Sequence, residues 1–141
     1  MNVFQRFDAG ALASKEPPKK RHDCQVRALC SALGVIYETA WTMLYVMQGE
    51  RRACSFSLVN ELQDRHPSLH VVRQLDFPAV KGKPRMTPQA FASAHPRGRF
   101  ILKMAHHVAC MKDGKLLDTW DSSRRCVYTA WEIDPKKNGE S

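Results

Sequence analysis

The residues best suited to chemistry lie on either side of a tight turn near the C-terminus. The Asp-Gly dipeptide at positions 113–114 is typical of two-residue β-hairpin turns, and it separates two β-prone runs. With residues 112 and 115 paired, side chains of equal parity share a face, so His107 and Asp118 become diagonal neighbours. A carboxylate there accepts the imidazole N–H, fixes the tautomer and stabilises the imidazolium. The hairpin therefore predicts a His–Asp pair suited to general-base chemistry.

Two further features of this hairpin bear on the pair. Trp120 shares its face and is expected to exclude water from the His107–Asp118 bond. The opposite face carries a rival pair, His106 and Asp121. Because adjacent strand residues point to opposite faces, His106 and His107 together make a poor metal site.

Cys24 is the candidate nucleophile because it begins an expected helix, directly after Asp23, which is a good N-cap. A helix N-terminus favours the thiolate through its dipole and its free N–H groups, and these groups can help to hold an oxyanion. The other cysteines are expected on an apolar helix face, in core strands, or in a basic segment without a helix start: Cys30, Cys110, Cys126 and Cys54. Only Cys24 is placed to react.

The elements that must position these residues fall into two groups. Helices are expected over 24–33, 37–48 and 57–65, with a short one that opens at Thr87-Pro88 and ends before Pro96. Strands are expected over 69–75, 100–105, 107–112, 115–120 and 126–131. Helices followed by an antiparallel sheet predict an α+β fold. The expected divisions are a loosely structured arm (1–22), a single domain (23–133) and a flexible tail (134–141).

Composition narrows the class of protein. The chain has 141 residues, enough for one domain with its own core. Its five cysteines are odd in number and include no C-x-x-C pair, so we expect no disulfide framework, no metal and no cofactor. Residues 1–16 lack the pattern of a signal peptide, and the most apolar stretch (35–47) is too short to span a membrane. A cytoplasmic protein is expected.

The net charge of +8 favours acidic partners such as nucleic acid, an anionic membrane surface or a cell-wall polymer. The charge is scattered, however. The compact clusters are at 19–21, 51–52 and 124–125, and each is typical of a solvated surface.

The order of a helix-starting Cys, a strand His and a polar residue on the next strand resembles that of papain-like cysteine peptidases. The segment 118–120, Asp-Thr-Trp, is similar to their Asn-x-Trp, in which Trp covers the residue that orients His. Here Asp replaces Asn, as in several branches of that superfamily. Parts of 23–29 and 98–121 also resemble small papain-like proteins of phage and bacterial genomes, whereas the middle of the chain (35–97) does not.

The resemblance implies N-terminal helices that carry the Cys, packed on a C-terminal antiparallel sheet that carries His and Asp. It also implies a thiol hydrolase, a peptidase or an amidase, in which Cys24 attacks a carbonyl, His107 shuttles the proton and an acyl-enzyme forms. Deamidation and acyl transfer use the same residues. The substrate would be a protein or peptide, and a phage protein of this kind would act in the host cytoplasm or the virion.

One departure from the family leaves alternatives open. Papain relatives place a Gln shortly before the Cys to complete the oxyanion hole, but residues 17–23 contain neither Gln nor Asn, and Gln5 is far upstream. A backbone N–H or His22 would serve instead, or activity would be weak. The same departure supports a second interpretation, a non-catalytic papain-like module that binds a protein partner. A third, a basic nucleic-acid-binding domain, has support from charge but from no recognised motif.

Overall fold

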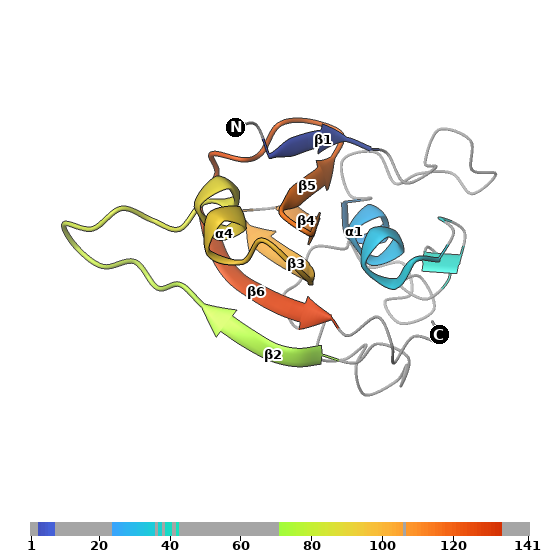
Figure 1. Ribbon diagram of the computed structural model, residues 1–141, viewed down its shortest axis with the longest axis horizontal. Helices are drawn as coiled ribbons and strands as arrows, with labels where there is room; N and C mark the ends of the chain where they lie inside the picture. Colours follow the sequence, from blue (N-terminus) through green and yellow to red (C-terminus); the bar gives the residue numbers. More distant parts are fainter. Residues whose placement is uncertain are drawn as a thin grey trace.

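The computed structural model describes residues 3–7, 24–35, 37, 39–40, 42, 71–105 and 107–133. In this part of the chain, a mixed six-stranded sheet is combined with two helices, α1 (Cys24–Leu33) and α4 (Pro88–Ala94) (Figure 1). The expectation of an α+β fold is confirmed. The strands are β1 (Phe4–Arg6), β2 (Val71–Asp76), β3 (Arg99–Met104), β4 (His107–Lys112), β5 (Lys115–Asp118) and β6 (Val127–Ile133).

The strand order across the sheet is β1-β5-β4-β3-β6-β2, with β1 and β2 at the two edges (Figure 1). All neighbours are antiparallel except β1 and β5, which are parallel. The expected strands pair antiparallel with one another, and the sheet is mixed because β1, which was not expected, pairs parallel to β5. Strand β1 lies in the arm expected to be loosely structured. Its three residues carry too little pattern to indicate a strand, and its partner is more than a hundred residues away.

Helix α1 has the bounds that its sequence predicted. Its apolar residues recur on one face, which is buried against the sheet, and Leu29 and Ala32 are among them. Gly34 adopts a positive φ of 72° directly after the helix, and its N–H donates to the carbonyl of Cys30. Glycine adopts this left-handed conformation without steric cost, so it ends the helix cleanly.

Helix α4 also follows its local signals. The Thr87 side chain accepts a hydrogen bond from the N–H of Ala90 at 3.1 Å, and Pro88 occupies the first turn, where no N–H is needed. Phe91 is fully buried and meets the ring of Phe100 edge-on at 4.8 Å. This contact fixes α4 on one face of the sheet.

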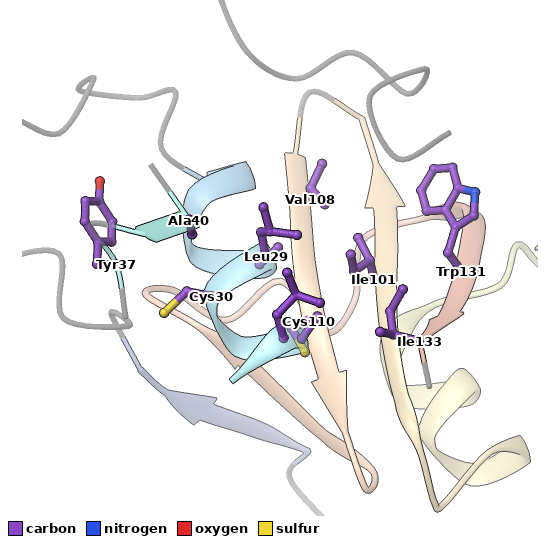
Figure 2. Close-up of a cluster of buried hydrophobic side chains, with 12 residues drawn as sticks. Leu29, Cys30, Tyr37, Ala40, Ile101, Val108, Cys110, Trp131 and Ile133 are labelled. Carbon is purple, nitrogen blue, oxygen red and sulfur yellow. The ribbon is translucent and has the colours of Figure 1, made fainter. Parts of the chain in front are cut away.

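The two helices cover opposite faces of the sheet. Alternate strand residues divide between two apolar clusters: Ile101, Val108 and Cys110 pack with α1, whereas Phe100, Ala109 and Met111 pack with α4. Figure 2 shows Leu29 of α1 beside Val108 and Cys110, with Ile101 and Ile133 further along the sheet. Each cluster is continuous, so the sheet is the central layer of the fold.

The hairpin of β4 and β5 has the register that the turn predicted. Lys112 pairs with Lys115 and Cys110 pairs with Leu117. Asp113 and Gly114 both have positive φ, 49° and 78°, as a two-residue turn of this hand requires. Strand β5 ends at Asp118, two residues earlier than expected, because the backbone bends there.

The other expected elements agree in part with those of the structure. The strand expected over 69–75 is β2, and the one expected over 126–131 is β6. Of the helix expected over 37–48, residues 37, 39–40 and 42 are described and are helical. The helix expected over 57–65 and the tail over 134–141 lie outside the described residues. Within the described ranges, no helix is long and apolar enough to cross a membrane.

Candidate active site

His107 and Asp118 form a buried, directly bonded pair. The Nε2 atom of His107 lies 2.5 Å from Oδ2 of Asp118, and the side chains are 7% and 2% exposed. His107 is the first residue of β4 and Asp118 is the last of β5, so the pair lies at one end of the sheet. The hairpin register predicted this proximity.

Both oxygens of the Asp118 carboxylate are held by further groups. Oδ1 accepts the N–H of Thr119 at 2.8 Å, and Oδ2 accepts the hydroxyl of Ser122 at 2.9 Å. The Arg27 guanidinium reaches Oδ1 from helix α1 at 3.7 Å. A carboxylate bonded in this way keeps a single orientation, so it can hold the imidazole of His107 in one position.

Sequence reasoning missed Arg27 and Ser122. Arg27 has a signal in retrospect, since it lies three residues after Cys24 and therefore near it on the helix surface. Ser122 has none, because it reaches Asp118 through an irregular turn whose shape no local pattern predicts.

Trp120 lies against the imidazole. The two ring centroids are 4.9 Å apart, with the planes tilted by 43°. The indole is 39% exposed, and the Arg125 guanidinium lies over it, 5.7 Å from the ring centroid. Trp120 therefore covers part of His107 and limits the access of water to the His107–Asp118 bond, as expected from the shared face.

Helix α1 points its N-terminus at this end of the sheet. Its first turn contacts the pair through Arg27, whereas its last turn lies at the other end, where Arg99 donates to the carbonyl of Ala32 at 3.2 Å. Arg99 pairs with Lys112, next to the hairpin turn and far from His107. The helix start, and with it the backbone of Cys24, is thus directed towards the His–Asp pair.

The pair and α1 belong to different faces of the sheet by alternation, since Val108 is packed under α1 and His107 is its neighbour. Arg27 nevertheless reaches Asp118, and both members of the pair lie at strand ends. The site therefore lies at the end of the sheet, where Arg27 connects it to helix α1.

Several predicted residues lie outside the described part of the structure. These are the side chain of Cys24 and all of His22, Asp23 and His106. Of the rival pair, His106 and Asp121, only Asp121 is among the described residues. Its carboxylate accepts hydrogen bonds from Ser123, and these bonds lower the pKa of Asp121. Gln5 lies on β1 beside Leu117 and is exposed.

The other described cysteines are buried or half-buried, as is typical of structural thiols. Cys30 is buried, and its Sγ donates to the carbonyl of Val35. Cys110 is buried beneath α1, and the loss of solvation raises its pKa to about 12. Cys126 is half-buried just before β6, and Cys54 lies outside the described residues. Cys110 is therefore a neutral thiol at physiological pH and no nucleophile.

The residues described contain no group of three His, Cys, Asp or Glu side chains that could hold a metal ion. Comparison of the chain with protein-family models, curated proteins and solved structures found no match.

Proposed function

We propose that this chain is a thiol-dependent hydrolase, a peptidase or amidase with a papain-like arrangement of Cys24, His107 and Asp118. The observation that carries the proposal is the buried His107–Asp118 bond of 2.5 Å at the end of the sheet that faces the start of α1. A bonded and buried His–Asp pair beside a helix that begins with Cys supplies the base, its orienting group and the nucleophile.

The proposed reaction follows from these roles. His107 bonds Asp118 through Nε2, so Nδ1 is the nitrogen that takes the proton from the Cys24 thiol. The thiolate attacks the substrate carbonyl, and the imidazolium returns the proton to the leaving amine as the C–N bond breaks. Water, deprotonated by His107, then hydrolyses the acyl-enzyme and restores the thiol.

The choice of Cys24 rests on its place in the fold. It is the first residue of α1, where the helix dipole and the unpaired N–H groups favour a thiolate. Cys30 and Cys110 are buried in the core, so neither has access to a substrate.

The proposal is tested by the alkylation rates of all five thiols with iodoacetamide between pH 5 and 9, with modified sites read by mass spectrometry. Cys24 is expected to react fastest and to stay reactive well below the ordinary thiol pKa of about 8.5. His107→Ala should return Cys24 to ordinary behaviour. His95→Ala is the matched control, since His95 is a half-buried His that packs on Phe91 and Phe100, away from the pair.

The opposite outcome would be an ordinary titration of Cys24 that ignores His107. The catalytic role would then be withdrawn, and a module that binds a protein partner through the same scaffold would be the better account.

A further inference from the structure

Arginine side chains flank the His107–Asp118 pair on the solvent side. Arg125 lies beside Trp120, and Arg6 lies on edge strand β1 next to Asp118; both side chains are exposed. Arg125 and Arg6 together form the arginine rim. Neither takes part in the chemistry proposed above.

Two contacts hold Arg125 in place. Its Nη2 donates to the carbonyl of Ala105 at 3.3 Å, and its guanidinium lies over the indole of Trp120. Ala105 precedes His107 by two residues, and Trp120 packs on the His107 ring. The charge of Arg125 is therefore held beside Trp120, which packs on the imidazole, while it remains open to solvent.

Arg6 occupies the other flank. It is the register partner of Asp118 in the parallel pairing of β1 with β5, and neighbouring strands are about 4.8 Å apart. Residues paired in this way project from the same face, so Arg6 and Asp118 share a side of the sheet. The backbone beyond Arg6 is fixed as well, because the N–H of Phe7 donates to the carbonyl of Asp118 at 2.7 Å.

The carboxylates of this region are already engaged. Asp118 is buried and bonded to His107, and Asp121 accepts hydrogen bonds from Ser123 and lies near the charge of Arg124. The exposed guanidinium groups of the rim thus present positive charge to whatever approaches His107. Guanidinium binds carboxylate with two paired hydrogen bonds, and this geometry favours the carboxylates of a peptide as ligands of the rim.

We propose that the arginine rim is a subsite for a carboxylate of the substrate, so that the thiol hydrolase acts on an acyl group next to an acidic side chain or a free C-terminus. This inference rests on the proposed function, because it places the subsite beside the base of that reaction. It adds a substrate class that the site residues alone do not define.

The test compares two alkylating agents on one thiol. Iodoacetate and iodoacetamide displace iodide by the same attack, but only iodoacetate carries a carboxylate. We expect Cys24 to favour iodoacetate at pH 7 in the native protein, and Arg125→Gln to lower the iodoacetate-to-iodoacetamide rate ratio about two- to fivefold. Arg125→Lys retains the charge but loses the paired hydrogen bonds of the guanidinium, so it should keep only part of the preference. High salt should reduce the ratio, since charges at 1 M salt are screened beyond about 3 Å.

Arg97→Gln is the matched control, because Arg97 is exposed at the far end of the sheet, before β3, and should leave the ratio unchanged. Because both rates are taken on one thiol, a general change in its reactivity cancels from the ratio. A ratio that Arg125→Gln and Arg97→Gln change equally, or not at all, overturns the subsite and leaves the proposed function standing. A Cys24 that reacts like an ordinary thiol with both reagents overturns both.

To distinguish a side-chain carboxylate from a terminal one, two N-acetylated peptides are tested for their ability to protect Cys24 from iodoacetamide. N-acetyl-Ala-Glu-Ala-amide carries a side-chain carboxylate, and N-acetyl-Ala-Ala-Ala carries a terminal one. The peptide that slows alkylation in the native protein, but not in Arg125→Gln, identifies the source. Protection by neither peptide counts against the subsite.

Discussion

At the scale of single residues, Asp118 is the residue on which the site depends. A buried carboxylate loses its hydration and must recover it from protein donors. Asp118 does so with His107 and Ser122 on one oxygen and with Thr119 and Arg27 on the other. Because these donors come from three different segments, the carboxylate joins the hairpin, the following turn and helix α1.

Ser122→Ala tests this role of Asp118. The variant removes a hydroxyl that donates to Oδ2 at 2.9 Å from a fully buried position. Hydrogen bonds to charged groups contribute about 1.5–3 kcal/mol, so the free energy of unfolding in urea should fall by about that amount. Ser93→Ala is the control, since its exposed hydroxyl makes a 3.5 Å contact within α4 and should cost less than about 0.5 kcal/mol. Equal losses in the two variants would show that Ser122 does not support Asp118.

At the scale of elements, helix α1 and strand β4 form the contact that orients the site. The apolar face of α1 lies on Val108 and Cys110, and this packing directs the helix start to one end of the sheet (Figure 2). The thiol of Cys110 is therefore part of the interface between α1 and β4. Its ionisation reports on that interface, because a thiolate would have to form without water.

Cys110 predicts a loss of stability at alkaline pH. Burial raises the pKa of Cys110 to about 12, above its value in the unfolded chain, so the folded state keeps a proton that the unfolded state loses. The stabilising contribution is complete below about pH 9 and declines as the pH rises towards 12, by up to about 1.4 kcal/mol per pH unit.

The measurement is the free energy of unfolding of the native protein and of Cys110→Ala between pH 8 and 11. Lysine and tyrosine titrate in both proteins, so the difference in slope belongs to Cys110. Cys126→Ala, which removes a half-buried thiol, should keep the steeper slope of the native protein. Parallel curves for native protein and Cys110→Ala would mean that solvent reaches the thiol.

At the scale of the whole molecule, strands from both ends of the described chain, β1 and β6, belong to one sheet. Strand β1 closes the edge next to β5, with Leu116 donating to the carbonyl of Val3 at 2.9 Å and the Val3 side chain buried in the cluster under α4. An open β5 edge would expose the backbone next to Asp118 to water. The N-terminal strand therefore protects the candidate site without contributing a reacting group.

Val3→Asp tests this protection. A carboxylate at a position that is 8% exposed should detach β1 and lower the free energy of unfolding by about 2–4 kcal/mol. The amide of Leu116 should then exchange with solvent much faster, as measured by hydrogen exchange. Val72→Asp is the matched control, because Val72 is 52% exposed on edge strand β2. Unchanged exchange at Leu116 in Val3→Asp would show that β1 does not close this edge.

The sequence by itself determined the features that depend on near neighbours. The bounds of α1, the cap of α4 and the register of the β4–β5 hairpin follow from helical periodicity, a Thr-Pro start and an Asp-Gly turn. Because the hairpin is local, strand alternation also predicted that His107 and Asp118 meet. All of these features involve residues close together in the sequence. Once the turn or the helix start has formed, such residues have few other conformations available.

Tertiary structure alone decided what depends on contacts between distant segments. The parallel pairing of β1, the reach of Arg27 to Asp118 and the bond from Ser122 join parts of the chain whose patterns say nothing about one another. The position of Arg6 beside Asp118 arises in the same way. Such contacts are selected by the burial of two apolar faces on one sheet, which is a property of the assembled layers and of no single segment.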